Sequence, residues 1–169
     1  MSEQKAPAQT GEAAIRCLVV PLDGAALLIP NALVSEVAPF HPPVPTAGPS
    51  WLLGHIEWRG LAVPLISIET LAGMAGGQPQ RLSRAIVFNT LNGNPQMPFI
   101  AVLSRAIPRM QLVTAGTLPS NSETVPEGLL GRFEQDGETL LIPDLDRIEQ
   151  WLHDGGIVVK RAELTIEKV

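Results

Sequence analysis

Short apolar runs separated by turn residues dominate this chain, with turns roughly every 8–12 residues. Runs of this length, rich in Val, Ile and Leu, are typical of β-strands, and a Gly in the connection tolerates the positive φ of a tight hairpin. Four pairs of runs have this form: 15–22 with 25–29, 55–58 with 61–66, 84–91 with 98–103, and 129–134 with 139–142. The pattern therefore predicts a mainly β protein built from hairpins.

Two short helices are predicted where a residue suited to capping follows a strand. Ser67 can cap a helix that ends at Gly73, since Gly favours the left-handed conformation at a helix C-terminus. Asp144 opens a second helix, whose apolar residues recur at spacings of three and four, as on one helical face. Pro64 lies inside a predicted strand without an N–H to donate, so we expect it at a strand edge or a break.

A weak internal repeat combines a turn, a short strand, a Pro and a helix start. Residues 23–31 resemble residues 136–144, and residues 60–64 repeat part of the same unit. The irregular distances exclude a solenoid, which needs a fixed period, and favour two similar lobes.

The chain is expected to form one domain with additions at both ends. Residues 1–13 are small and polar and are predicted to be a disordered tail. Residues 14–154 form the two-lobed domain, and residues 155–169 are an extra element of undetermined structure. The Pro-dense segment 39–49 is interpreted as an extended connector, with a Pro-rich ligand for another domain as the alternative.

Composition indicates a folded chain that relies on a partner. Of 169 residues, 45% are hydrophobic and only 17% are charged, so we expect another protein to cover part of the surface. The net charge of −5 opposes a nucleic-acid role, which needs a concentrated basic footprint. No acidic residue occurs between Glu69 and Glu123, a stretch that contains Arg81, Arg84, Arg105 and Arg109. This asymmetry indicates either charged side chains that simply face solvent or a basic face that binds an acidic partner.

Little in the sequence points to catalysis. The single cysteine, Cys17, lies in a strand-like run, where a thiol usually acts as a small hydrophobe. The three His residues do not share metal-ligand spacing, and no nucleophile or phosphate-binding motif is present. Glu57 and Glu69 are interpreted as solvated surface carboxylates. We therefore predict no enzyme activity, no metal and no cofactor.

The sequence also predicts a cytoplasmic protein without direct membrane insertion. The N-terminus lacks the apolar core of a signal peptide, and no apolar run approaches the about 18 residues that a membrane span needs. A single cysteine excludes a disulfide framework and fits a reducing compartment.

One charged residue, Arg59, stands at a predicted hairpin turn beside Trp58. Trp and Arg are enriched at interface hot spots, whereas core packing is the alternative interpretation of Trp58. We hypothesise that Arg59 pairs with Glu36, because a guanidinium can bind a carboxylate through two hydrogen bonds. Direct contact between Arg59 and a partner is the competing role.

Several segments, taken in order, resemble those of one known family. They are LLIP at 27–30, VSEV at 34–37, PSWLLG at 49–54, WRG at 58–60, VPLISI at 63–68 and the closing hairpin over 129–144. Together, from about Ile15 to Leu152, they resemble the CheW-type coupling domain, an adapter of bacterial chemosensory arrays.

The resemblance implies a mainly β fold of two small five-stranded β-barrel lobes of SH3-like type, packed together with a few short helices. It also implies a non-catalytic adapter that binds the regulatory domain of a CheA-type histidine kinase and the cytoplasmic tip of methyl-accepting chemoreceptors. The kinase is expected to dock near Val34 and Val37, and the receptor helix in the groove between the lobes. The candidate interface residues are Val34, Glu36, Val37, Trp58, Arg59 and Gly60.

The chain also departs from the family pattern. Glu57 and Trp58 stand where the family has Asn and Leu, and Ser67 stands where Asp is common. This divergence suggests an auxiliary adapter, for example of a system that controls type IV pili and twitching motility. A rival hypothesis is a small β-barrel ligand-binding module unrelated to chemotaxis. Small barrels usually fill their interior with side chains, however, and convergent polar groups are not evident in this sequence.

Overall fold

The computed structural model describes residues 13–116 and 124–162. The strands within these ranges are β1 (Ile15–Pro21), β2 (Ala26–Pro30), β3 (Val34–Pro39), β4 (Leu52–Trp58), β5 (Leu61–Ile66), β6 (Arg84–Asn89), β7 (Phe99–Ser104), β8 (Arg109–Val113), β9 (Leu129–Gln135), β10 (Glu138–Pro143) and β11 (Lys160–Arg161). The helices are the 3-10 helix η1 (Asn31–Leu33), α1 (Ile68–Leu71) and α2 (Leu145–Asp154). This content confirms the predicted mainly β class with a few short helices.

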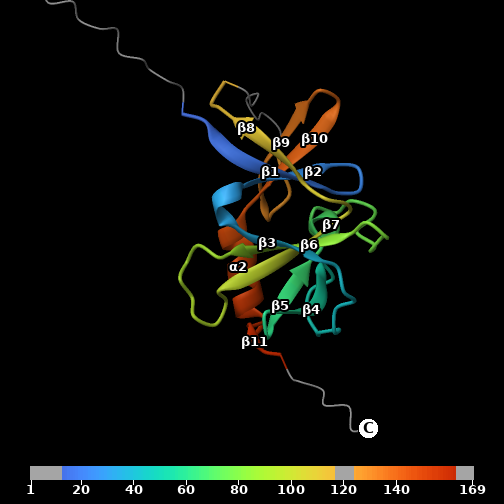
Figure 1. Cartoon of the computed structure of the whole chain (residues 1–169), viewed down its shortest axis with the longest axis vertical. Coiled ribbons are helices and arrows are strands. Elements are labelled where there is room, and N and C mark those ends of the chain that lie inside the picture. The colour runs from blue at the N-terminus through green and yellow to red at the C-terminus, as the bar shows by residue number, and fades with distance from the viewer. Residues whose placement is uncertain (1–12, 117–123, 163–169) are drawn as a thin grey trace, which may run out of the picture.

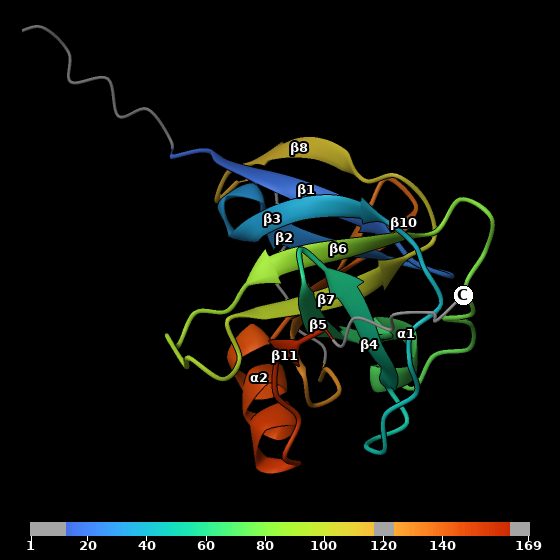
Figure 2. The same ribbon diagram turned by 60° about the horizontal axis from the view of Figure 1, so that its bottom comes forward.

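The strands form two sheets, one above the other in Figure 1. The five-stranded sheet has the order β8-β1-β2-β10-β9 and brings together strands from both ends of the described chain. The six-stranded sheet has the order β11-β5-β7-β6-β3, with β4 paired along β5. In Figure 2, helix α2 extends below β7. Five strands were predicted for each lobe, and β11 is the addition that raises one sheet to six.

The copies of the internal repeat are not divided with one full copy in each sheet. The strands of its two best-matching copies, β2 and β10, are parallel neighbours in the five-stranded sheet, where Leu140 pairs with Ala26. The partial copy contains β5, which is a parallel neighbour of β7 in the six-stranded sheet, with Leu65 opposite Ala101. Each copy therefore contributes a strand to a parallel pair.

The apolar core has three parts. The inter-sheet core contains residues from both sheets and from α2, including Val20 and Ile86. Each sheet also has a smaller core of its own. Along β1, Leu18 and Val20 belong to the inter-sheet core, whereas Cys17 and Val19 belong to the core of the five-stranded sheet. Burial on both faces explains why this strand is a continuous apolar run and not an alternating one.

Pro64 is accommodated at a break between two strand neighbours. Strand β4 pairs along the length of β5, so the other neighbours of β5 share its opposite edge. On that edge β11 pairs with Leu61 and Ala62, and β7 pairs with Leu65 and Ile66. Pro64 falls between these registers, where no ladder bond requires its missing N–H.

Both predicted helix starts carry a side-chain cap. Ser67 Oγ accepts from the backbone N–H of Thr70 at 3.3 Å, and Gly73 follows the helix with a φ of 70°. Asp144 Oδ1 accepts from the backbone N–H of Arg147 at 3.1 Å. These bonds satisfy N–H groups that have no partner within the helix, and they confirm the two predicted caps.

The segment after α2 is built into the fold. Ile157 is 5% exposed and belongs to the inter-sheet core. Further along, Lys160 pairs with Ala62 and Arg161 pairs with Leu61 in the β11–β5 ladder. Within the element whose structure the sequence left undetermined, Lys160–Arg161 is thus a strand, β11, of the six-stranded sheet.

Two further predictions concern the ends of the chain and the membrane. Residues 1–12 of the predicted disordered tail and residues 163–169 lie outside the described residues. Across the ranges that the structure describes, no helix is long and apolar enough to cross a membrane.

Candidate docking surface

The β4–β5 turn, formed by Arg59 and Gly60, has an unusual backbone. Trp58 pairs with Leu61, so the turn contains two residues, and both have positive φ, 50° at Arg59 and 76° at Gly60. This is the pattern of a type I′ turn, which favours Asn, Asp or Gly at both positions. An Arg at positive φ is disfavoured by contacts of its Cβ with the backbone, so the turn is locally strained at Arg59.

A single carboxylate oxygen of Glu36 contacts both Trp58 and Arg59 at this turn. Arg59 Nη2 lies 3.1 Å from Glu36 Oε2, and Trp58 Nε1 donates to the same oxygen at 2.9 Å. The hypothesised pair is present, but one guanidinium nitrogen contacts one oxygen, and not two nitrogens two oxygens. The Arg59 guanidinium carbon also lies 4.6 Å from the centroid of the Trp58 ring, within the range of a cation–π contact.

Burial divides these three residues into core and surface. Trp58 is 7% exposed and packs edge to face on Phe99, with ring centroids 4.8 Å apart. The side chains of Arg59 and Glu36 are 66% and 38% exposed. Exposed ion pairs are worth at most about 1 kcal/mol, so this pair contributes little to stability. Core packing is therefore the main role of Trp58, and Arg59 remains accessible to a partner.

The two valines of the candidate site differ in exposure. Val37 is 38% exposed, whereas Val34 is half-buried and packs against the inter-sheet core. The pairing of β3 with β6 shifts register between Val34 and Glu36, which marks a β-bulge. A hollow of about 370 Å³ adjoins β3 and the β4–β5 turn and is lined in part by Glu36, Trp58 and Arg59. Val37 is thus accessible but does not line this hollow, because successive side chains of a strand point to opposite faces, and Val34 packs on the inter-sheet core.

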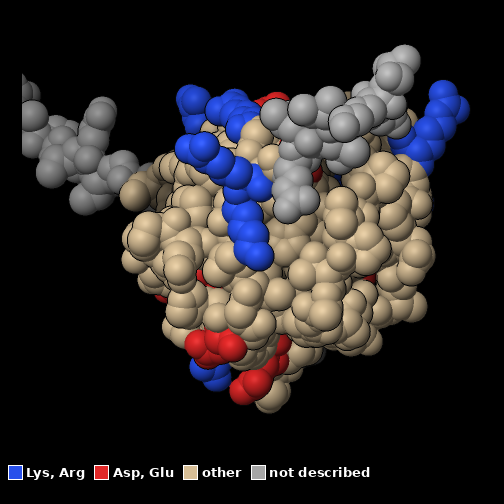
Figure 3. Space-filling model, turned by 90° about the horizontal axis from the view of Figure 1, so that it is seen from below, with Lys and Arg blue, Asp and Glu red and all other residues tan. Residues whose placement is uncertain are grey.

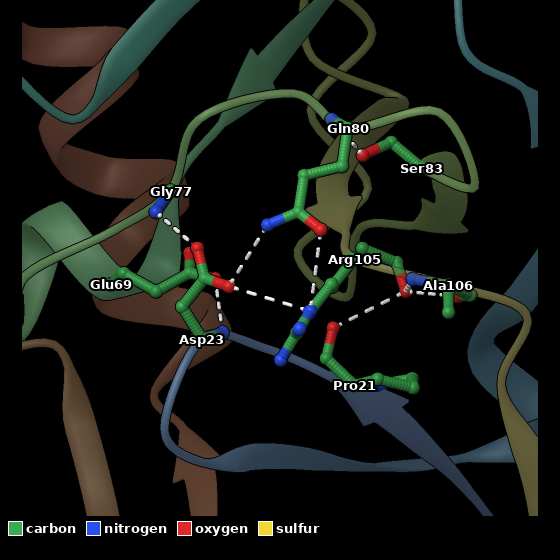
Figure 4. Close-up of polar contacts among 9 residues, drawn as sticks. Pro21, Asp23, Glu69, Gly77, Gln80, Ser83, Arg105 and Ala106 are labelled. Atoms are coloured by element: carbon green, nitrogen blue, oxygen red, sulfur yellow. Dashed lines mark hydrogen bonds and ion pairs between the residues drawn. The ribbon is translucent and has the colours of Figure 1, made fainter.

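The interpretation of Glu69 as a surface residue was wrong. Glu69 is 2% exposed, and its Oε1 accepts from the backbone N–H of Asp23 at 3.0 Å (Figure 4). Its other oxygen accepts from Ser67 Oγ at 3.2 Å. A buried carboxylate is costly unless it is hydrogen-bonded, and these donors make the burial possible. Glu57, in contrast, is exposed as expected.

Asp23 connects the β1–β2 turn to loops of the six-stranded sheet. Asp23 Oδ2 accepts from the backbone N–H of Gly77 at 2.9 Å, and Asp23 Oδ1 lies 3.6 Å from Arg105 Nε (Figure 4). The backbone N–H of Arg105 also donates to Pro21 O at 2.8 Å. These contacts join residues from both sheets, and they fix how the sheets sit on one another.

The arginines of the acid-free stretch are largely engaged within the chain. Arg105 contacts Asp23, and Arg109 Nη2 lies 2.6 Å from Glu138 Oε2. Arg84 donates to the carbonyls of its neighbours in the chain. These contacts favour internal use of the arginines over a dedicated basic face.

Two titratable groups, the half-buried His55 and the buried Glu149, have altered pKa values. His55 Nδ1 lies 2.6 Å from Thr46 Oγ1, and Nε2 lies 3.2 Å from Val158 O. Burial lowers the pKa of His55, as does the charge of Lys160, while the bond to Val158 opposes them. Burial also raises the pKa of Glu149, against the bond from Asn92.

Two features typical of catalysis, a reactive thiolate and a cluster of metal ligands, are not found among the described residues. Burial raises the pKa of the Cys17 thiol, which disfavours the reactive thiolate. Within residues 13–116 and 124–162, no three His, Cys, Asp or Glu side chains gather as potential metal ligands.

The described residues thus form a mainly β protein of two packed sheets, with an exposed Arg at a hairpin turn. The chain belongs to the CheW-like domain family, whose model matches residues 16–152. The fold is similar to the scaffolding protein TtCheW from Thermoanaerobacter tengcongensis, with a TM-score of 0.64 and 18% identity over 83% of this chain and 91% of that one. No match to a curated protein was found. CheW family proteins are non-catalytic scaffolds that couple chemoreceptors and kinase, so this chain is a chemotaxis adapter and not an enzyme.

Proposed function

We propose that this chain couples chemoreceptors to a CheA-type histidine kinase by binding the regulatory domain of the kinase and the cytoplasmic tip of the receptor. Membership of the CheW-like family supports this role. The observation that carries the proposal for this chain is the Glu36–Trp58–Arg59 arrangement. A core Trp and a shared carboxylate hold an exposed Arg at a defined place on the surface.

The kinase contact is assigned to the surface around Val37 and the β4–β5 turn. Val37 supplies exposed apolar area, and Arg59 supplies a guanidinium charge that lies over the Trp58 ring. Interfaces commonly combine a small apolar centre with Arg and Trp, which matches this composition. The receptor helix is assigned to the groove between the two sheets, by analogy with the family alone.

The two sheets are proposed to be β-barrel lobes of SH3-like type. Each has its own small core, formed by residues such as Val63 and Ala101 in one and Val19 and Leu140 in the other. Side chains therefore occupy the interior that a small-ligand module would need to keep open. This packing favours the adapter over the ligand-binding alternative.

Trp58 supports placing the chain in an auxiliary pathway, such as one that controls type IV pili. An indole N–H at this position reaches Glu36, which the Leu common in the family could not do. The carboxylate of this chain is thus held by two donors, and its docking surface differs chemically from the family pattern.

Calorimetric titration of the kinase regulatory domain into the full chain tests the proposal. Val37→Glu should weaken binding at least tenfold, because it places an unpaired charge in an apolar contact, a loss of about 1.4 kcal/mol or more. Leu130→Glu is a matched control, since Leu130 is 64% exposed and lies on β9 of the other sheet. Equal affinity of the two variants would contradict the assigned surface.

A further inference from the structure

The C-terminal strap, residues 157–162, begins with firm attachments and lies outside the residues that match the family model. Ile157 is buried in the inter-sheet core. The backbone N–H of Val159 donates to Gln96 O at 2.8 Å, which ties the strap to the β6–β7 connection. The strap is therefore a fixed part of the fold from its first residues.

The middle of the strap lies against the β4–β5 hairpin. Val158 O lies 3.2 Å from His55 Nε2, on β4. Lys160 then pairs with Ala62 on β5. The exposed Lys160 belongs to a terminal strand of the sheet, where charged side chains discourage pairing with further strands. The strap thus supplies the terminal strand on this side of the sheet.

The end of the strap reaches the β4–β5 turn itself. Arg161 pairs with Leu61, and the backbone N–H of Ala162 donates to Gly60 O at 2.9 Å. Figure 3 shows the molecule from below, the side on which β11 lies in Figure 1, with the largest group of basic side chains at the upper left of this face. The bond to Gly60 restrains the residue that follows Arg59. A non-Gly residue such as Arg59 keeps a positive φ only where its surroundings enforce it.

We propose that the C-terminal strap positions the β4–β5 turn, so that Arg59 is presented to the partner only while Ala162 is bonded to Gly60. Release of the strap frees the turn to leave its left-handed conformation, and docking weakens. The inference rests on the proposed function for the identity of the partner, while the restraint of the turn is a property of the free chain.

Hydrogen exchange on the full chain without a partner tests the restraint. Ala162→Pro removes the N–H that bonds to Gly60, and Ala162→Ser keeps it as the matched control. We expect backbone amides of residues 58–62 to exchange about tenfold faster in Ala162→Pro, the loss of roughly one hydrogen bond. Ala162→Ser should stay within about twofold of the unaltered chain.

Calorimetry with the kinase regulatory domain tests the positioning role. Ala162→Pro should bind about tenfold more weakly, and Ala162→Ser with unchanged affinity. Equal exchange in the two variants overturns the proposal, and so does faster exchange with unchanged affinity. Absence of binding by the unaltered chain would instead defeat the proposed function, and the exchange difference would remain measurable.

Discussion

Trp58 and Glu36 are joined by a hydrogen bond of 2.9 Å between a core indole and a surface carboxylate. Trp58 is 7% exposed and packs in the core of the six-stranded sheet, so its N–H projects from a rigid site. The same oxygen of Glu36 contacts Arg59. The accessible charge of Arg59 is therefore held by groups that the core itself positions.

Replacing Trp58 with Phe should separate its packing from its hydrogen bond. The smaller ring can still pack on Phe99, but Glu36 loses one donor. We expect the free energy of unfolding to fall by about 2 kcal/mol, as for a hydrogen bond to a charged group combined with lost volume. Urea denaturation measures this change. Trp151→Phe is the control, because Trp151 is half-buried and packs on Trp51; an equal loss there would show that the bond to Glu36 adds nothing.

Arg59→Asn should separate docking from stability. Asn tolerates a φ near 50° better than Arg, which offsets the loss of an exposed ion pair, so the free energy of unfolding should change by less than about 1 kcal/mol. Affinity for the kinase regulatory domain should nevertheless fall at least tenfold, a loss of about 1.4 kcal/mol measured by calorimetry. Asp136→Asn is the matched control, since Asp136 has a φ of 51° in the turn between β9 and β10. If both variants bind alike, Arg59 does not contact the kinase.

Local features of the fold were predictable from the sequence because they depend on neighbouring residues. The hairpin turns contain Gly where the backbone needs positive φ, and Ser67 and Asp144 cap the helices that follow them. The pair of Arg59 with Glu36 was also predicted, from the family pattern together with the preference of guanidinium for carboxylate.

Apart from the pair of Arg59 with Glu36, which spans 23 positions, features that depend on distant contacts were not predictable. Glu69 is buried because the backbone N–H of Asp23, 46 positions away, donates to it. The bond from Trp58 to Glu36 spans 22 positions and requires the relative placement of β3 and β4. The strand character of β11 depends on an available edge of β5, which its two charged residues do not reveal. Pattern and propensity describe segments, whereas these contacts arise only when segments meet.

Glu149→Gln should stabilise the protein near neutral pH. Burial raises the pKa of Glu149, with a smaller contribution from Asp146, so its charged form is disfavoured in the folded state. The stability linked to this group is complete below the unfolded pKa of about 4.3 and is lost as pH rises through the folded pKa. Gln keeps an oxygen that can accept from Asn92 and removes the charge. We expect a gain in the free energy of unfolding at pH 7 and none at pH 4, measured by urea denaturation. A gain that is the same at both pH values would contradict this explanation.

His55 should give the opposite pH dependence. Burial lowers its pKa, and its neutral ring fits both neighbours, accepting from Thr46 and donating to Val158 O. The stability linked to this group is complete above the unfolded pKa of about 6.5 and is lost as pH falls through the folded pKa, because the unfolded chain binds the proton more readily. In thermal melting from pH 5 to 8, the melting temperature should therefore fall less on acidification in His55→Asn than in the unaltered chain. His41→Asn is the control, since His41 is exposed in the segment between β3 and β4. Because Val158 belongs to the C-terminal strap, acidification should also speed amide exchange at residues 58–62 in the unaltered chain, after correction for the intrinsic rate. This extra exchange should be absent from His55→Asn if protonation of His55 is what loosens the strap.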